Sequence, residues 1–545
     1  GRRAHGREFD GPSGPYPFES QVNGTGRESG PGELVSPILQ FDALARSEPS
    51  KTCIVVDSFS YTRAQILEAA DALAAGLAAY GVGQGDRIAI IRRNAPIHMI
   101  ALLAASRIGA VLLPLNFRLS SVECQAIIDD AGCAAVLCGP RFARQFDEEL
   151  DLSPEILWIV DDIDPSIEPP EDDSLHFIWQ RLSELYRAGE GMVPDAVPIR
   201  ADALALLLYT SGSTGKAKGV KLTYGNVFAS WAAFSEVLGT GPDDVALAIA
   251  SFGHVGGLNT FTFATLLAGG LVVVQRKWDV GDALAKIERY RVTRTFGVPT
   301  MYDAMARHPD FGSRDLSSLK TAIVGGACCP KDLCDVFTAR GVPLANSWGM
   351  TETAGGGTLT PPKDMARHCA QVGKAAPGMK MRVAREDGSE ALVGEVGELW
   401  VSGPSVSPGY WGKPEGQGCG FSDDGWFHTG DLVSVDAEGF YTIEGRAKDL
   451  IISGGENIYP AEIETVLRNH PAVAEAVVVG MPDNRWGELP AAFVVADDGA
   501  DLDLEEVRAF AATRLAKYKV PRTMAELDAI PLGSTGKPDR GALAR

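Results

Sequence analysis

The chain has 545 residues, of which 45% are hydrophobic and 22% charged, and its formal net charge at pH 7 is -21. A chain of this length and composition is expected to form several domain-sized units with large apolar cores. So large a negative charge argues against a general affinity for nucleic acid or anionic membranes, although it leaves room for a local nucleotide site.

The first 35 residues are rich in glycine, proline, serine and charge and lack an apolar signal-peptide segment, which predicts a disordered leader. The longest apolar stretch, residues 99–115, contains Arg107 and is predicted to be a buried helix and strand, so no stable membrane insertion is expected. Nine cysteines lack metal-ligand spacing, which predicts free thiols in a reducing, cytoplasmic location.

Amphipathic helical stretches alternate with short apolar runs through most of the chain. Apolar residues at helical spacing over 64–80 are followed by a glycine break and a buried strand at 87–91. Such alternation predicts an α/β fold with parallel sheets. Further helix–strand pairs are predicted at 99–108 and 110–113 and at 283–290 and 293–298, with another strand at 322–324.

From Gly439 the pattern changes to short strands, at 440–444 and 476–479, followed by a helix at 504–515 whose charge runs from acidic to basic. This pattern predicts a compact α+β unit of about a hundred residues at the C-terminus. We place the domain boundary at 446–449.

An apolar strand at 203–209 leads into a loop, residues 210–219, that is dense in glycine, hydroxyl groups and lysine. Glycines let backbone N–H groups approach an anion, hydroxyls donate further hydrogen bonds and lysines neutralise charge, so the loop is predicted to bind phosphate. It is not a Walker A loop, because two residues rather than four separate Gly212 from Gly215. Taken alone, the loop could also be a flexible turn with incidental lysines.

Residues 209–219 resemble the signature loop of the adenylate-forming superfamily, which includes acyl-CoA synthetases, adenylation domains and firefly luciferase. The resemblance implies that the loop wraps the β- and γ-phosphates of ATP. Ala217 stands where the family usually has proline, and Lys216 falls on a variable position and is assigned no role. The implied ATP-binding residues of the loop are Thr210, Ser211, Gly212, Ser213, Thr214, Gly215 and Lys218.

Residues 346–352 resemble the family's aromatic-Gly-x-Thr-Glu motif. An aromatic ring can stack on adenine, and a carboxylate can hold Mg²⁺ against phosphates. The resemblance places Trp348 beside adenine and gives catalytic roles to Thr351, on phosphate, and Glu352, on Mg²⁺. Trp replaces the commoner Tyr and keeps a stacking surface; by itself, the motif would more often be a helix N-terminus. The other ATP-site positions implied nearby are Gly326, Ala327, Asn346, Ser347 and Gly349.

The loop Gly325-Gly326-Ala327 resembles the segment where adenine and the acyl group lie against bare backbone, although alone it would equally be a strand-end turn. His254, which precedes Val255 in a glycine-flanked loop, matches an acyl-site position of fatty and aryl acid ligases. Lone histidines are usually structural, but the flanking glycines allow close approach of a substrate. The acyl pocket is thus predicted to comprise His254, Val255, Gly325 and Gly326.

Asp431 follows a Thr-Gly turn, where a carboxylate can accept hydrogen bonds from both ribose hydroxyls, as the family uses it; in isolation it would be a turn cap. The long segment 445–464 also matches the family. It implies nucleotide contacts for Arg446 and, in the preceding strand, Ile443, and a hinge at Lys448. The residues that would line the path of the coenzyme A thiol are Ser453, Gly454 and Gly455.

Residues 531–537 resemble the family's terminal motif, whose lysine reaches the adenylation site, so Lys537 is assigned a catalytic role. Without that context, a lysine so near the C-terminus would be solvated. Residues 397–399 with 409–410 match a structural signature and are assigned no chemistry. Together the matches imply a large N-terminal ATP- and acyl-binding domain (36–446) and a small, mobile α+β C-terminal lid (447–545).

The resemblance implies an acid–thiol ligase that activates a carboxylic acid with ATP and Mg²⁺ as acyl-AMP, releases pyrophosphate and then forms a coenzyme A thioester. Apolar, glycine-rich surroundings of His254 favour a fatty or aromatic acid over an amino acid. One alternative is a stand-alone acyl-AMP ligase that loads a carrier protein in trans. A non-catalytic nucleotide sensor is disfavoured, because Glu352, Asp431, Arg446 and Lys537 are all present. A homodimer is compatible with the sequence.

Overall fold

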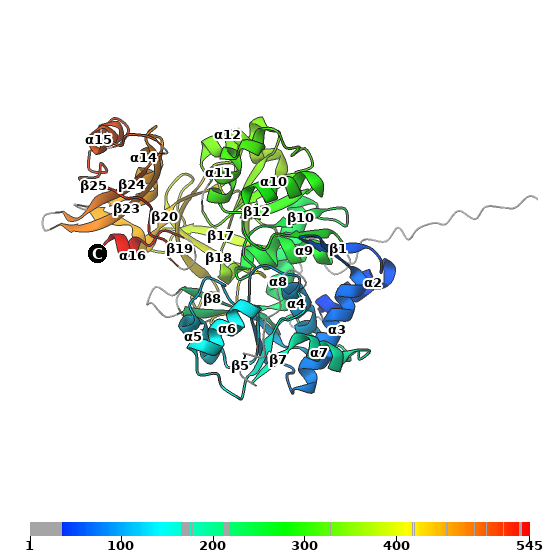
Figure 1. Ribbon diagram of the computed structural model, residues 1–545. Coiled ribbons are helices and arrows are strands. Elements are labelled where there is room, and N and C mark those ends of the chain that lie inside the picture. Colours follow the sequence, from blue (N-terminus) through cyan, green and yellow to red (C-terminus); the bar gives the residue numbers. More distant parts are fainter. Residues whose placement is uncertain are drawn as a thin grey trace, which may run out of the picture.

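The computed structural model describes residues 35–164, 175, 178–211, 217–327, 329–416, 418, 420–453, 456–483, 486–497, 499–515, 517–533 and 537–545. The predicted leader lies outside this range apart from its last residue. The described chain forms sheets of nine, seven, four and five strands. In Figure 1 the blue, cyan and green elements make up the larger part of the molecule, and the orange and red C-terminal elements gather at one end.

The seven-stranded sheet is parallel except at one edge. Its strands lie in the order β7 (Trp179–Arg181), β6 (Leu157–Val160), β5 (Cys133–Cys138), β3 (Arg87–Ile91), β4 (Val111–Pro114), β8 (Leu204–Ser211) and β9 (Ala217–Thr223). The β8–β9 pair is antiparallel, which turns the chain back at the predicted phosphate loop. The connecting helices are α3 (Arg63–Ala79), α4 (Ile97–Ile108), α5 (Ser121–Ala131), α6 (Pro140–Glu149) and α7 (Leu182–Gly189).

The nine-stranded sheet has a parallel centre and antiparallel edges. Its order is β16 (Lys374–Ala375), β15 (Gly357–Leu359), β14 (Leu344–Gly349), β13 (Thr321–Val324), β12 (Arg294–Gly297), β10 (Val245–Ala248), β11 (Leu271–Val274), β1 (Thr52–Val56) and β2 (Phe59–Thr62). Strands β1 and β10 to β14 pair in parallel, as the helix–strand alternation predicts. The helical segments around this sheet are α2 (Pro37–Ser47), α8 (Tyr224–Leu238), η1 (Gly256–Phe263), α9 (Ala264–Leu267), α10 (Val280–Arg289), η2 (Pro309–Gly312), α11 (Pro299–Arg307), α12 (Lys331–Ala339), η4 (Pro362–Asp364) and α13 (Met365–His368).

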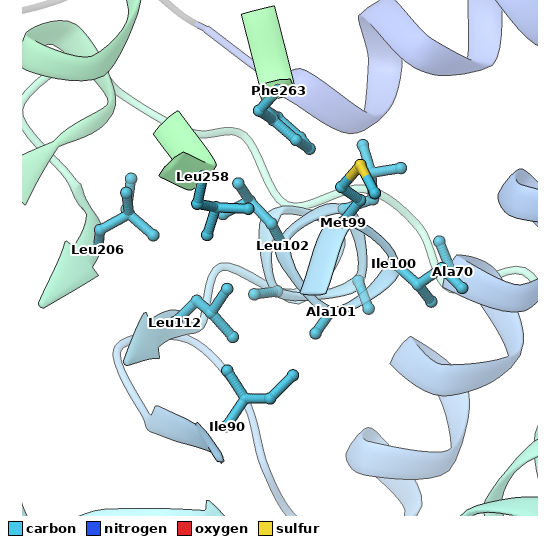
Figure 2. Packing of buried hydrophobic residues seen from close by; sticks show 14 of the residues in the cluster. Ala70, Ile90, Met99, Ile100, Ala101, Leu102, Leu112, Leu206, Leu258 and Phe263 are labelled. Atoms are coloured by element: carbon cyan, nitrogen blue, oxygen red, sulfur yellow. The ribbon is translucent and has the colours of Figure 1, made fainter. Parts of the chain in front are cut away.

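The largest apolar core is shared by the two big sheets, and α4 lies in its middle. All twelve residues of α4 are buried. Figure 2 shows Met99 and Leu102 of this helix among Leu112 and Leu206 of the seven-stranded sheet and Phe263 of η1. The same cluster contains residues of β1 and β11 from the nine-stranded sheet. The predicted buried helix and strand at 99–115 are therefore confirmed as α4 and β4.

Local sequence explains where the helices begin and end. Thr62 caps α3 in a capping box with Gln65, and Thr223 caps α8 in a box with Asn226. Gly109 ends α4 in the left-handed conformation, which glycine adopts without steric cost. Arg107, which interrupts the apolar stretch, forms an ion pair with Asp71 at 2.5 Å. Among the described residues, no helix combines the length and apolarity that a membrane span requires.

A four-stranded antiparallel sheet, which the sequence pattern did not predict, follows the nine-stranded one. It consists of β17 (Lys380–Ala384), β18 (Gly397–Ser402), β19 (Phe427–Val435) and β20 (Tyr441–Arg446). The strand expected at 440–444 is β20, so it belongs to this sheet. The short helix η5 (Ala447–Asp449) comes directly after β20.

The C-terminal elements form the five-stranded sheet with its own core. The strands are β22 (Glu456–Ile458), β21 (Ile451–Ser453), β24 (Gly487–Ala496) and β23 (Val473–Asp483), with β25 (Thr523–Glu526) beside β24. Helices α14 (Pro460–Arg468), α15 (Leu504–Ala512) and α16 (Arg540–Leu543) accompany it. The core of this unit contains only residues from Ile451 onward. An ion pair between Arg307 of α11 and Asp497, at 3.3 Å, links it to the larger part.

Candidate functional site

The arms of the predicted phosphate loop are the antiparallel strands β8 and β9. Thr210 pairs with Lys218 in their register, so both residues lie at the base of the loop. Gly212, Ser213, Thr214 and Gly215 lie outside the described residues, and for Ser211 the backbone is described as strand. The Lys218 ammonium nitrogen lies 5.6 Å from the ring centroid of Tyr410. Lys218, at the base of the loop, therefore lies beside Tyr410, which belongs to the 409–410 signature that was assigned no chemistry from the sequence.

The predicted magnesium ligand Glu352 lies on the short helix η3 (Thr351–Thr353), directly after β14. Its side chain is 7% exposed, and Oε1 accepts a hydrogen bond from the Tyr410 hydroxyl at 2.9 Å. Burial raises the pKa of Glu352 above its usual value, and this effect exceeds the opposing hydrogen bonds and the charges of Arg446 and Lys218. A bound cation would offset the cost of burying the charge of this carboxylate. Thr351, half-buried, precedes it.

Trp348, Asp431 and Arg446 form a connected group. The Trp348 indole N–H donates to Asp431 Oδ2 at 2.9 Å, and Arg446 Nε lies 2.6 Å from Asp431 Oδ1. Asp431 and Arg446 are register partners on β19 and β20, which explains the ion pair. The carboxylate is 4% exposed, and burial raises its pKa in spite of Arg446. Because a carboxylate has about four acceptor sites, these contacts leave room for ribose hydroxyls.

The turn that carries Asp431 is held by Glu398. Glu398 Oε1 accepts a hydrogen bond from the Gly430 N–H at 3.0 Å. The Thr429 hydroxyl donates to the Leu399 carbonyl at 2.8 Å and accepts from the Asp431 N–H at 3.0 Å. The structural signature at 397–399 thus positions the predicted ribose-binding carboxylate.

Two side chains of β14 support the sheet rather than open to the site. Asn346 is fully buried and donates to the Cys369 carbonyl, and the Ser347 hydroxyl donates to the Val324 carbonyl at 3.2 Å. Because the Asn346 side chain is buried, its position does not support the predicted contact with the nucleotide. Ile443, on β20, pairs with Val433 and packs at the edge of a core that includes Trp348.

Gly325 of the predicted acyl pocket lies against one aromatic ring, together with Gly256, which was not predicted. A β-carbon on Gly325 would lie 2.7 Å from Cε2 of Phe296, and one on Gly256 would lie 2.6 Å from its Cε1. Only glycine therefore lets both backbones approach this ring so closely. Phe296, at the end of β12, is half-buried and stacks on Phe261 with 5.0 Å between ring centroids. Next to Gly325, Gly326 has a φ of 81°, in the left-handed region, and is exposed together with Ala327.

His254 lies in the turn before η1, with Val255 next to it. Its Nε2 is 3.4 Å from Nδ2 of Asn116. Burial, together with the positive charges of Arg118 and Lys537, lowers the pKa of His254 to about 4. A lowered pKa means that the imidazole is neutral at physiological pH. No sequence motif pointed to Asn116 or Arg118 at this place.

Lys537 is exposed, and its positive charge lowers the pKa of both Asp431 and His254. Loss of hydration and the charges of Arg446 and Lys448 lower the pKa of Lys537, while Asp431 acts in the opposite direction. The structure therefore brings Lys537 into electrostatic range of the ribose-side carboxylate and of His254. Arg540 anchors the terminal segment by donating to Glu464 Oε1 at 2.6 Å.

Ser453, the one described residue of the predicted thiol path, is not part of this assembly. Ser453 is buried at the end of β21, and its strand pairs with β22 and β24 inside the C-terminal sheet. Gly454 and Gly455 lie outside the described residues. Lys448, on η5 between the two parts of the chain, is exposed.

The site suits ATP and Mg²⁺. A single buried carboxylate, a lysine at the loop base and a second buried carboxylate beside an arginine match a magnesium nucleotide, because Mg²⁺ is usually held by one or two carboxylates together with substrate phosphates. The described residues contain no group of three or more His, Cys, Asp or Glu side chains that could hold a metal ion.

Trp348→Phe tests the contact between the indole and Asp431. Loss of one hydrogen bond to a buried carboxylate costs about 1 kcal/mol, so the KM for ATP is expected to rise about fivefold with little change in kcat. Steady-state kinetics with varied ATP measure this. Trp179→Phe is the matched control, because Trp179 Nε1 donates to Asp147 Oδ1 at the same distance, 2.9 Å, in the seven-stranded sheet. An unchanged KM for W348F would contradict the role of the indole N–H.

Comparison with known proteins agrees with this geometry. The AMP-binding enzyme family profile matches residues 41–411, and the profile of the AMP-binding enzyme C-terminal domain matches residues 462–537. The chain is 37% identical to a feruloyl-CoA synthase of Amycolatopsis sp over 92% of this chain and 97% of that protein. It is 35% identical to an indoleacetate–CoA ligase of Aromatoleum aromaticum over 91% and 95% of the two chains.

Solved structures of a related CoA synthetase have the same fold. The o-succinylbenzoate CoA synthetase of Bacillus subtilis in complex with its acyl-adenylate intermediate superposes with a TM-score of 0.82 at 30% identity, covering 94% of this chain and 99% of that one. The same enzyme in complex with ATP and a magnesium ion gives a TM-score of 0.79, covering 92% and 98% of the two chains at 30% identity.

All of these relatives are CoA synthases or ligases by name, which supports coenzyme A over a carrier protein as the acceptor. The chain belongs to the AMP-binding enzyme family and is an AMP-forming acid–CoA ligase that uses ATP, Mg²⁺ and coenzyme A.

Proposed function

We propose that the acid activated by this ligase is an aromatic carboxylic acid. The observation that carries the proposal is the position of Phe296, whose ring lies against bare backbone at Gly325 and Gly256 and stacks on Phe261. Phe296 therefore places an aromatic ring next to Gly325, a predicted acyl-pocket residue, and an aromatic pair with a substrate ring would add about 0.5–1.5 kcal/mol beyond the burial of area. The feruloyl-CoA synthase and indoleacetate–CoA ligase names support the same class.

In the first half-reaction, a carboxylate oxygen attacks the α-phosphate of ATP, and pyrophosphate leaves with the electron pair of the broken P–O bond. Glu352 holds Mg²⁺, which neutralises charge on the phosphate oxygens. Thr210, Thr351 and Lys218 bind the phosphates, Asp431 orients the ribose and Arg446 holds Asp431. Lys537 neutralises charge that moves between the carboxylate and the α-phosphate. Such positioning and charge stabilisation, rather than proton transfer, accelerate the step.

In the second half-reaction, the thiol sulfur attacks the acyl carbon, AMP leaves and the thiol proton is released. The proposal assigns a hinge to Lys448, in the three-residue helix between the four-stranded and C-terminal sheets. Rotation there would withdraw Lys537 and bring Ser453, with Gly454 and Gly455, to the acyl-adenylate. Few residues need to change their backbone angles in such a motion.

The proposal also includes a reducing, cytoplasmic location, which the seven described cysteines support because all of them are buried free thiols. A homodimer stays a prediction, to be tested by light scattering during size-exclusion chromatography.

The test of the aromatic class is a product assay. The protein is incubated with ATP, Mg²⁺, coenzyme A and a panel of aryl, fatty and amino acids, and acyl-CoA and AMP are detected by mass. Aryl-CoA as the preferred product would support the proposal. Preference for fatty acids would overturn the aromatic class, and acyl-AMP without any acyl-CoA would overturn the thiol acceptor.

Phe296→Ala refines this test. Removal of the ring is expected to lower the ratio of kcat/KM for the best aryl acid to that for a fatty acid about tenfold, because the aryl acid loses an aromatic partner and its buried area. The ratio is taken within one variant, so partial loss of folded enzyme cancels. A ratio equal to that of the parent would show that Phe296 does not line the acyl site.

A further inference from the structure

Residues 407–411, which we call the bracing segment, lie along the edge of β9. The Trp411 N–H donates to the Gly219 carbonyl at 2.7 Å, and the Lys221 N–H donates to the Gly409 carbonyl at 3.0 Å. Between them, Val220 and Tyr410 form an isolated antiparallel bridge. The bracing segment therefore fixes the backbone of the strand that carries Lys218 at the base of the phosphate loop.

The same segment also holds Glu352. The Ser407 N–H donates to the Glu352 carbonyl at 2.7 Å, and the Tyr410 hydroxyl donates to its carboxylate at 2.9 Å. Tyr410 is 7% exposed, and its ring packs edge-to-face on Phe421 with 5.8 Å between centroids. Because the Lys218 ammonium lies over the same ring, one side chain contacts both the phosphate-loop lysine and the carboxylate.

We propose that Tyr410 is a positioning residue that orients the Glu352 carboxylate toward the divalent cation of the magnesium nucleotide. This inference rests on the proposed role of Glu352. The terminal torsion of a glutamate is broad, so a buried carboxylate needs a partner to fix its direction. The phenol engages Oε1 and so settles how the group can present its oxygens to a cation. Hydrogen bonds of this kind to metal-ligating carboxylates tune metal affinity.

The experiment measures cation binding rather than turnover. Mn²⁺ is titrated into the full chain with α,β-methylene-ATP and without acid or coenzyme A, and free Mn²⁺ is followed by electron paramagnetic resonance. Tyr410→Phe keeps the ring and removes the hydroxyl, and it is expected to weaken Mn²⁺ binding about tenfold. Tyr80→Phe is the matched control, because the Tyr80 hydroxyl donates to Gln180 Oε1 at the same 2.9 Å on the exposed surface. Binding to Y80F should equal that of the parent.

Glu352→Gln and the double variant complete a cycle. If Tyr410 acts through Glu352, adding Y410F to E352Q should weaken Mn²⁺ binding no further. Parent-like Mn²⁺ binding by Y410F together with weakened binding by E352Q would overturn the inference and leave the role of Glu352 intact. Parent-like binding by E352Q would overturn both. Binding of α,β-methylene-ATP is also measured in the presence of EDTA, which removes the divalent cation. If Y410F weakened this binding as much as it weakened binding of Mn²⁺, the substitution would have damaged the base of the phosphate loop, and the inference would again be overturned.

Discussion

Lys537→Ala is expected to abolish adenylation while thioester formation from a preformed acyl-adenylate continues. Removal of one preorganised transition-state donor costs about 10²–10³-fold in rate, and Lys537 is the cation whose charge acts on both Asp431 and His254. Once the acyl-adenylate exists, no charge has to be neutralised between a carboxylate and the α-phosphate. Pyrophosphate release measures the first step, and acyl-CoA formed from synthetic acyl-AMP measures the second.

Lys517→Ala is the control for this separation, because Lys517 is an exposed lysine of the same C-terminal unit that has no role in the proposed mechanism. It should leave both half-reactions at the parent rate. Equal loss of both half-reactions in K537A would refute the assignment of Lys537 to the first step alone, and it would also remove the main support for a rotation about Lys448.

Asp431→Asn is expected to impair both half-reactions, because ribose has to be held in ATP and in the acyl-adenylate alike. Hydrogen bonds to a charged acceptor contribute about 1.5–3 kcal/mol against about 1 kcal/mol for neutral pairs, so the KM for ATP should rise about tenfold. The affinity for acyl-AMP should fall by a similar factor. Kinetics of each half-reaction with varied nucleotide measure these changes.

Asp244→Asn separates loss of ribose binding from loss of a buried charge. Asp244 is similarly buried and lies 3.0 Å from Arg294, but it directly precedes β10, and its other side-chain partners are Lys320 and Thr293 rather than residues of the predicted nucleotide site. D244N should lower the Tm without changing the KM for ATP. If D431N lowered the Tm in the same way but left the KM unchanged, Asp431 would be a structural residue rather than a ribose ligand.

The alternating elements were predictable because their apolar periodicity and their caps point to the same structure. α3 has helical spacing and a Thr62–Gln65 capping box, and β3 is a nearly continuous apolar run that is buried on both faces. The four-stranded sheet was not predicted, because burial in its strands does not follow apolarity: in β19 the polar residues Thr429 and Asp431 are buried, whereas Leu432 is half-buried. The π-helix η1 was also missed, because its Gly-Gly start and its Thr and Phe residues give no periodic signal.

The residues of the site were likewise predictable only in part. Motifs that resemble the family pointed to Trp348, Glu352, Asp431, Arg446 and Lys537. The structure brings Trp348, Asp431 and Arg446 into contact and places Glu352 and Lys537 in electrostatic range of Arg446. Tyr410 was matched only as part of a structural signature without assigned chemistry, and Phe296 was not matched at all, because the importance of both arises from distant partners. A tyrosine becomes a positioning candidate only when folding places a buried carboxylate 58 positions away in sequence within reach of its hydroxyl.

The burial of α4 between the two large sheets has a consequence for how the molecule can be divided. Each sheet by itself resembles a complete parallel α/β unit, yet neither could exist alone without exposing the helix that the other covers. The two large sheets are therefore expected to unfold together as one cooperative unit, because separating them would expose the apolar surface of α4. The C-terminal sheet encloses its own apolar core, so the proposed rotation at Lys448 would leave the core of the two large sheets intact.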